Sequence, residues 1–544
     1  MARIVGRAAG LLLALATALV VNVWNAPPAM GHAVLIESVP RDGAALEVAP
    51  ERVILTFSEP VTVPSGGVRV FDADATRVDL GPAQLGDATQ AGVDLQPGLA
   101  DGAYVISWRV VSADSHPVSG VFTFTVGEAL ALDTSVLETF ADEQAGISTV
   151  LRALLRAATY LATLIAAGLL YARWLFGRHD SVRSRVRLPV VGAAGAAVAC
   201  SVVSIPVHAM DITGFGLTDI ATSAVLADVA VSSFGQSTAF RLIWLAMLVL
   251  FAWRRAPEAA QLLAGTLAVV SFVFDGHQRS VEPTWLLMTA DGLHVIAAAF
   301  WMGGLAVAAV VAKQVWQNNR LDSATELLTA FSNAALWLLL VVAATGSVMS
   351  WTLVGGTDGL STGYGYAWLV KMALVVVVVA IAAYNRWKLL PNLVALDWRR
   401  LALTLRIEVG ALASVLVATG VLVSLPPAVQ QVAAESMFAD RQWVDDRYEV
   451  ELVVEPGRVG VNALHLYVLD ADGRPSADVD DVVLELLYVP EQIGPARLSP
   501  FFAGTGHWIA NVDDLQFPGR WQITVVFAAD RFSEHRVTFD VDVR

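Results

Sequence analysis

The chain has 544 residues, of which 56% are hydrophobic and only 16% are charged. This composition is unusual for a soluble globular protein and fits a membrane-embedded core with soluble ends. The net charge of −15 argues against nucleic acid as a partner. A single cysteine, Cys200, excludes an intramolecular disulfide and a thiolate metal cluster, so any metal site must use His, Asp, Glu or Met.

Residues 1–31 have the features of a secretory signal peptide. They combine a basic start, an apolar stretch over residues 10–23 and a small-residue cleavage motif at residues 29–31. An uncleaved membrane anchor is the alternative, although the apolar stretch is short and two prolines end it. Cleavage after Gly31 would make His32 the new amino terminus.

Residues 32–127 are predicted to form a compact β domain, an immunoglobulin-like sandwich or a barrel. Short runs rich in Val, Thr, Phe, Tyr and Trp are separated by Gly, Pro and Asp, which is typical of strands and turns. The clearest runs are Arg52–Ser58, Gly67–Ala73, Ala103–Ser112 and Gly120–Val126.

Residues 148–425 contain apolar runs that suit helices across a hydrocarbon core of about 30 Å. We predict eight crossings: Ser148–Phe176, Leu188–Met210, Thr238–Trp253, Ala259–Phe274, Thr284–Val311, Phe331–Val354, Ala367–Tyr384 and Leu401–Leu425. Lys and Arg follow the first, third, fifth and seventh spans, and the other loops carry few of them. The positive-inside rule then places both soluble ends outside the cytoplasm, and an even number of spans agrees with this.

Residues 128–147 and 426–446 are predicted linkers, and residues 447–544 return to the strand pattern of an immunoglobulin-like sandwich. The histidines of this last region, His465, His507 and His535, are scattered along the sequence. A structural or docking role is expected for the region.

The strongest group of candidate metal ligands combines His32 with Asp114 and His116. A free amino-terminal histidine offers its α-amine and its imidazole to one ion. Asp114 and His116 are two residues apart, so an extended chain directs both side chains to one face. Three nitrogens and a carboxylate oxygen favour Cu(II), and Glu59 could add an oxygen or orient a ligand. The alternative is that His116 is an ordinary turn residue.

The β domain resembles the CopC family of periplasmic copper-binding proteins. The resemblance rests on His32-Ala33, on Leu55-Thr56-Phe57-Ser58-Glu59-Pro60-Val61 and on the run from Trp108 to Gly120, which contains Asp114-Ser115-His116. It implies that His32, Asp114 and His116 bind Cu(II), with Glu59 as a further candidate. The Met-rich Cu(I) segment of some family members has no counterpart between His32 and the first span.

Polar residues inside the predicted spans are candidates for function. His208 closes the second span, His277 follows the fourth, and His294 lies about 15 Å into the fifth, near the midplane. Asp291 is one turn from His294 on nearly the same face. The alternative is that the residues at span ends are only interfacial.

The membrane region resembles the CopD family of copper-resistance membrane proteins. The matching residues are Gly276-His277, Asp291-Gly292-Leu293-His294, Trp301–Leu305, Tyr364-Gly365 with Lys371, and Asn385-Arg386. This resemblance implies movement of copper across the inner membrane, commonly inward, with Cu(I) as a candidate form in the membrane. Through Pro456-Gly457, Gly460-Val461-Asn462, Asp470–Gly473 and Gly519-Arg520-Trp521, the carboxyl-terminal region weakly resembles the YtkA or FixH type.

The leading hypothesis is a non-enzymatic copper transporter of the bacterial inner membrane, with both soluble domains on the periplasmic side. Its expected partners are copper ions, the lipid bilayer and a periplasmic copper chaperone or reductase. Three alternatives stay open: a copper chaperone or sensor without transport, a haem-binding membrane redox protein, and an oxidative copper enzyme.

Overall fold

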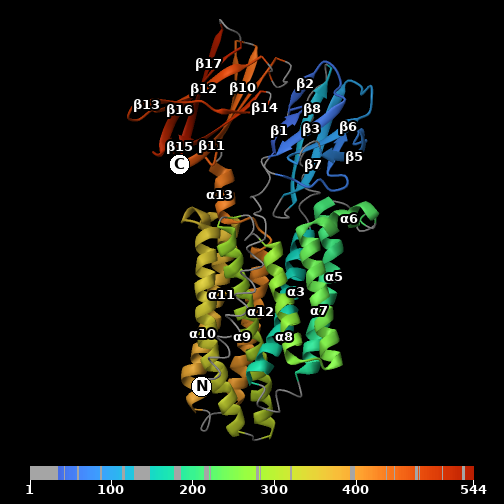
Figure 1. Ribbon diagram of the computed structural model, residues 1–544, viewed down its shortest axis with the longest axis vertical. Helices are drawn as coiled ribbons and strands as arrows, with labels where there is room; N and C mark the ends of the chain where they lie inside the picture. Colours follow the sequence, from blue (N-terminus) through green and yellow to red (C-terminus); the bar gives the residue numbers. More distant parts are fainter. Residues whose placement is uncertain are drawn as a thin grey trace. The chain divides into compact units, whose positions relative to one another are not determined.

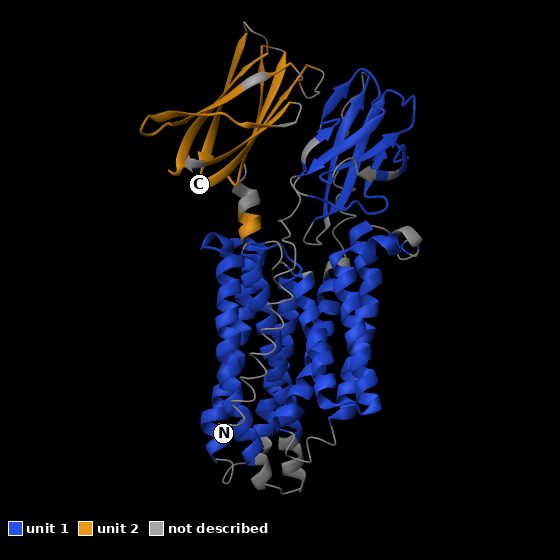
Figure 2. Ribbon diagram, viewed as in Figure 1, with its two compact units in different colours: residues 1–428 blue, residues 429–544 orange. Residues whose placement is uncertain are grey.

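The computed structural model of the chain contains two compact units, residues 1–428 and 429–544 (Figure 2). The structure describes residues 35–41, 43–57, 60–85, 88–112, 117–127, 147–176, 186–213, 220, 222–276, 281, 283–318, 321–392, 398–436, 438–445, 447–471, 476, 478–504, 506–529 and 533–544.

The first unit begins with a sandwich of two four-stranded sheets (Figure 1). One sheet has the order β1 (Leu35–Val39), β3 (Arg52–Phe57), β6 (Gln90–Leu95), β5 (Asp79–Leu85), and the other β2 (Ala44–Leu46), β8 (Pro117–Val126), β7 (Gly102–Val111), β4 (Val68–Phe71). Alternate residues of β3, Val53, Leu55 and Phe57, are buried, as the period of two in a strand requires. Phe57 meets Trp108 of the other sheet edge to face, with ring centroids 5.3 Å apart. The two sheets therefore share one core.

The rest of the first unit is helical. Its elements are α3 (Ile147–Phe176), α5 (Arg187–Thr213), α6 (Ser223–Val231), α7 (Ser233–Arg254), α8 (Glu258–Val270), η1 (Ser271–Asp275), α9 (Thr284–Asn318), α10 (Leu321–Val354), η3 (Asp358–Ser361), α11 (Gly363–Tyr384), η4 (Asn385–Leu389), η5 (Leu390–Asn392) and α12 (Trp398–Leu422). In the described part of the chain seven helices are long and apolar enough to cross a membrane: α3, α5, α7, α9, α10, α11 and α12. The predicted span Ala259–Phe274 falls on the shorter pair α8 and η1.

Small residues let the central helices approach closely. A Cβ atom added to Gly168 of α3 would lie 2.0 Å from the carbonyl oxygen of Ala299 on α9, and one added to Gly303 would lie 1.9 Å from the carbonyl carbon of Gly168. Gly420 of α12 faces Ala153 of α3 in the same way. Such contacts stabilise helix pairs in lipid, where the hydrophobic effect gives no force between helices.

Two hydrogen bonds show which helix ends lie at the same height along the axis of the helical bundle. Arg156, in the third turn of α3, donates from Nη1 to the carbonyl oxygen of Val423, just after α12, over 2.8 Å. Ser237, in the second turn of α7, donates from Oγ to the carbonyl oxygen of Ser271 at the end of α8, over 2.8 Å. The amino end of α3 and the carboxyl end of α12 therefore lie on the same side of the bundle.

Helix α13 (Ala428–Ser436) precedes the strands of the second unit. One sheet has the order β14 (Phe501–Gly504), β15 (His507–Leu515), β11 (Gly460–Leu469), β10 (Tyr448–Glu455), β9 (Phe438–Val444). The other has the order β13 (Ile493–Leu498), β12 (Asp480–Tyr488), β16 (Gly519–Ala528), β17 (Glu534–Val543). Exposed and buried residues alternate along all of β17, and the buried faces of both sheets form a separate core.

Candidate functional site

Five of the predicted site residues lie outside the described part of the chain: His32, Glu59, Asp114, His116 and His277. The described strand ends that flank His32, Glu59, Asp114 and His116 in sequence form backbone pairs with each other. Leu35, three residues after His32 in sequence, pairs with Phe57, two residues before Glu59. Thr62 and Val111 exchange two backbone hydrogen bonds of 2.8 Å, and Val111 also pairs with Pro117 across the segment that holds Asp114 and His116. The fold thus gathers the strand ends that flank these candidates.

Two arginines of the sandwich bind the carboxyl end of α5. Arg109 of β7 donates from Nη1 to the carbonyl oxygen of Asp211 over 2.7 Å, and Arg69 of β4 donates from Nη2 to that of Thr213 over 2.8 Å. The last four carbonyls of a helix have no partner within the helix, and positive charge is favourable there. Burial lowers the pKa of the Arg109 guanidinium, and the nearby carboxylate of Asp211 opposes this shift.

The same face of the sandwich also contacts α6. Ser65 donates from its backbone nitrogen and from Oγ to the Asp228 carboxylate, over 2.9 and 3.0 Å. Val111, the last residue of β7, belongs to an apolar cluster with Ala209 and Ile212 of α5. Polar and apolar contacts together hold the end of β7 against α5 and α6.

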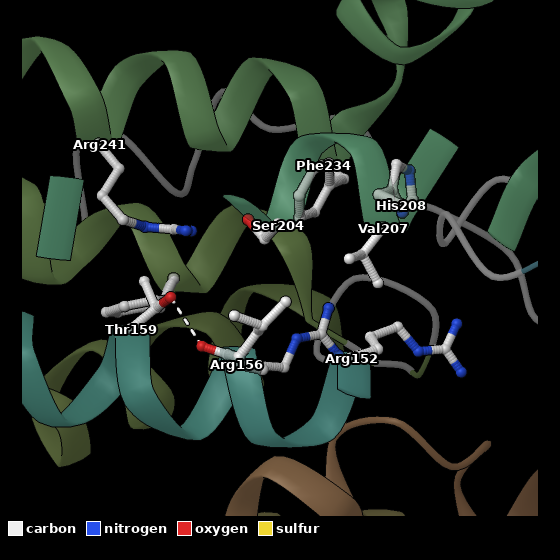
Figure 3. Close-up of a pocket in the computed structure, with 10 residues that line it drawn as sticks. Arg152, Arg156, Thr159, Ser204, Val207, His208, Phe234 and Arg241 are labelled. Atoms are coloured by element: carbon white, nitrogen blue, oxygen red, sulfur yellow. Dashed lines mark hydrogen bonds between the residues drawn. The ribbon is translucent and has the colours of Figure 1, made fainter. Parts of the chain in front are cut away.

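His208 lies in a pocket between α3, α5 and α7 (Figure 3). Its ring stacks on Phe234 with centroids 4.0 Å apart. Arg152, Arg156 and Arg241 line the same pocket. The carboxylate of Asp211 offsets one of these charges through an ion pair with Arg152. Because like charges repel most strongly where water is scarce, this pocket opposes the entry of a bare copper cation.

His294 occupies a different place, between α9 and α10. Its Nδ1 lies 3.0 Å from Oγ1 of Thr345, and this hydroxyl donates to the carbonyl oxygen of Val341 over 2.7 Å. The hydroxyl proton is therefore in use, so Nδ1 is the donor and Nε2 carries the lone pair. Asp291, only 8% exposed, is one turn away, and Lys371 of α11 acts electrostatically on both residues.

A cluster of polar side chains links α10 and α12 to the segment η4, which directly follows α11. Asn385 donates from Nδ2 to Oε2 of the buried Glu408 over 2.9 Å. Arg386 donates to the carbonyl oxygen of Ser332 over 2.7 Å and to Oδ1 of Asn333 over 2.9 Å. The two donors lie in the π-helical segment η4, a deviation from α-helix that is frequent at functional sites.

The surroundings of His208, of His294 and of Glu408 are three separate sites in the structure. Within the described residues, no three His, Cys, Asp or Glu side chains are close enough together to hold one metal ion. His208 and His294 therefore belong to separate environments, one lined by three arginines and the other with both the carboxylate of Asp291 and the amine of Lys371 nearby.

Comparison with known sequences identifies the family. Residues 35–127 match the CopC domain, residues 147–282 the N-terminal domain of copper resistance protein D-like proteins, and residues 325–422 copper resistance protein D. The chain belongs to the copper resistance family that fuses CopC to CopD. It is thus a multi-pass membrane protein of a copper resistance and transport family.

Individual relatives agree with this assignment. The copper transport protein CutJ of Bacillus subtilis is 26% identical over 93% of this chain and 95% of its own length. Copper resistance protein C of Escherichia coli is 34% identical over 18% of this chain and 83% of its own length. The crystal structure of PcoC, a methionine-rich copper resistance protein from Escherichia coli, is 33% identical and covers 18% of this chain and 99% of its own, with a TM-score of 0.16.

Four arginines at the contact between the CopC sandwich and helices α3 and α5, here called the CopC–CopD junction, were not among the predicted site residues: Arg69, Arg109, Arg152 and Arg156. Arg152 and Arg156 lie one turn apart within the first predicted span, which is a detectable signal because charges in spans are rare. Arg69 and Arg109 gave no such signal, since surface arginines on a β domain are ordinary. Only the fold shows that they contact α5.

Proposed function

We propose that the CopC domain of this chain captures Cu(II) on the periplasmic side and that the CopD helices carry copper inward. One observation supports this most. The end of β7, from which the chain continues to Asp114 and His116, is anchored to α5 by Arg109 and by the packing of Val111. A copper ion released from these ligands would start its path at the bundle rather than in bulk solvent.

The proposed capture site uses His32, Asp114 and His116, with Glu59 as an oxygen ligand or an orienting group. Removal of the signal peptide would free the α-amine of His32, so that one residue supplies two nitrogens. The complete donor set is a tetragonal nitrogen and oxygen environment, which suits Cu(II). The strand pairs Leu35 with Phe57 and Thr62 with Val111 support a common location for these groups.

Within the membrane we propose Asp291 and His294 as the main copper step. The Nε2 lone pair of His294 is a suitable ligand. The Asp291 carboxylate offsets the charge of Lys371 and attracts a cation where the dielectric constant is low. His277 is a further candidate near the outer surface. His208 is the weakest of the proposed residues, because three arginines share its pocket.

Eight crossings are the proposed topology, with α8 and η1 as the shortest. Thirteen α-helical and five 3₁₀ residues extend over about 30 Å, close to the thickness of a hydrocarbon core. The hydrogen bond from Ser237 to Ser271 supports a complete return of the chain to the level where α7 begins. Both soluble regions would then be periplasmic, in a bacterial inner membrane.

Passage as Cu(I) would require one electron from outside this chain, so a periplasmic reductase or a copper chaperone is the expected partner. No enzymatic activity is proposed. Copper is the transported substrate in this scheme.

Uptake by proteoliposomes tests the proposal. His116→Ala should weaken Cu(II) binding by at least a hundredfold, because one nitrogen ligand is lost. His294→Ala should abolish copper uptake and leave Cu(II) affinity unchanged. Titration of the purified, signal-cleaved protein with Cu(II) and entry of radioactive copper into vesicles measure the two effects, with His535→Gln as a matched control. Normal uptake by His294→Ala would exclude the membrane step, and unchanged affinity of His116→Ala would exclude the capture site.

A further inference from the structure

Two histidines that are far apart in sequence meet on one face of the carboxyl-terminal unit. His465 lies on β11 and His507 on β15, and His507 pairs with Tyr467. Strands β11 and β15 are neighbours in one sheet (Figure 1). Leu464 and Leu466 point into the core, so His465 and Tyr467 occupy the opposite face of the sheet. His465 and His507 are thus diagonal neighbours, which long side chains can bridge.

The facing nitrogens of this pair point at each other. Nδ1 of His465 and Nε2 of His507 are 3.4 Å apart, while the ring centroids are 5.6 Å apart and the ring planes differ by 17°. The difference between the two distances is close to twice the radius of an imidazole ring. Both nitrogens therefore lie near the line that joins the ring centres, and the rings face each other edge to edge.

This separation is that of a long hydrogen bond, which a shared ion could replace. Hydrogen bonds that involve N–H donors usually span about 2.7–3.2 Å. Two metal–nitrogen bonds of about 2.0 Å separate their nitrogens by about 3.3 Å at a tetrahedral angle and by about 4 Å in a straight line. Because the two nitrogens face each other along the line of the ring centres, the straight arrangement applies. The rings must therefore move apart by about 0.6 Å from the observed 3.4 Å to admit one ion.

We propose that His465 and His507 form a second copper site, which binds Cu(I) between two imidazoles. Structural zinc needs four ligands and Cu(II) favours a tetragonal set, but in the described part of the chain no third His, Cys, Asp or Glu joins this pair. Cu(I), a closed-shell ion, accepts two nitrogens in a nearly straight arrangement. The ion replaces the hydrogen that the two rings share, and that proton moves to the other nitrogen of its own ring.

The surroundings of the pair favour ligation. Burial lowers the pKa of His507 to about 4, with the charge of His465 as a smaller cause, and burial also lowers the pKa of His465. Both rings are therefore neutral at pH 7, the form that binds metal. The Tyr467 ring stacks on His507 with centroids 4.4 Å apart and covers one face of it. Both histidines remain partly exposed, so an ion can reach them.

Competition titration of the full-length protein in detergent tests this site. Cu(I), supplied as its acetonitrile complex, is titrated against bathocuproine disulfonate under anaerobic conditions. His465→Gln and His507→Gln should each lose one tightly bound Cu(I) per chain, while His535→Gln should lose none. Cu(II) binding at the CopC domain should not change in these variants, so failure of this inference is distinguishable from failure of the capture site. Equal Cu(I) stoichiometry in wild type and both variants would overturn the proposal.

A second measurement needs no substitution. Diethyl pyrocarbonate modifies neutral, accessible imidazoles, and mass spectrometry of peptides locates the modified residues. One equivalent of Cu(I) should reduce modification of His465 and His507 at least tenfold. Undiminished modification of the pair at saturating Cu(I) would contradict the site even if the variants fold poorly.

Discussion

Asp211 is the residue on which two contacts at the CopC–CopD junction depend. Its carboxylate pairs with Arg152 of α3, and its backbone carbonyl accepts a hydrogen bond from Arg109 of the sandwich. The two side chains of the ion pair are only 10% and 19% exposed. Loss of one partner of a buried pair is costly, because the other charge stays in a poorly solvated place.

We predict that Asp211→Asn destabilises the protein by about 1–3 kcal/mol. The change keeps the shape of the side chain and the backbone carbonyl, but leaves Arg152 beside Arg156 and Arg241 without its counter-ion. The apparent melting temperature of the purified protein in detergent should fall by several degrees. Asp94→Asn is the matched control, since Asp94 pairs with Arg52 on the surface. Equal melting temperatures of the two variants would show that the ion pair between Asp211 and Arg152 contributes nothing to stability.

Among the elements, the pair α3 and α9 is the most sensitive to side-chain size. We predict that Gly168→Ala lowers the melting temperature sharply or prevents folding, because its Cβ would overlap the backbone of α9. Helix propensity alone predicts the opposite sign, since alanine is favoured over glycine by about 1 kcal/mol. Gly192→Ala on α5, where a Cβ meets nothing within 4 Å, should be neutral or stabilising. Size-exclusion profiles after stepwise heating report both effects. A Gly168→Ala variant as stable as the wild type would refute close packing of α3 on α9.

The sequence predicted most elements where one physical signal dominates. The prediction Arg52–Ser58 corresponds to β3, and Ser148–Phe176 corresponds to α3, because the alternation in the first and the long, mainly apolar run in the second are clear signals. Strand β5 was missed, since Gly81 and Pro82 interrupt its pattern. Helix α10 begins ten residues before the predicted span Phe331–Val354, because its polar first turns carry no membrane signal.

Among the candidate site residues, those close together in sequence could be predicted, and those that only the fold brings together could not. Asp114 and His116 could be selected because they are close in sequence and have the chemistry of ligands. The contact of Arg109 with Asp211 joins residues 102 positions apart, and the pair His465 and His507 depends on which strands are neighbours. Strand order is a property of the complete sheet and cannot be derived from either segment alone.

At the scale of the whole molecule, the parity of the membrane crossings decides where the two soluble regions function. An even number would place the CopC domain and the carboxyl-terminal unit on the same side of the membrane, and in the proposed orientation both would meet periplasmic copper. An odd number would expose one of them to the cytoplasm. The hydrogen bond from Arg156, in the third turn of α3, to Val423, just after α12, favours the even number.

Cysteine labelling in intact cells tests this parity. In a Cys200→Ala background, Val48→Cys and Val461→Cys introduce single thiols at positions that are 79% and 72% exposed, one in each soluble region. Both should react with a membrane-impermeant maleimide once the outer barrier is opened, because both regions are expected to be periplasmic. Arg254→Cys, at the end of α7, should react only after the inner membrane is permeabilised, since basic residues gather on the cytoplasmic side. Labelling of Val48→Cys without Val461→Cys would require an odd number of crossings, and α8 with η1 would then not span the membrane.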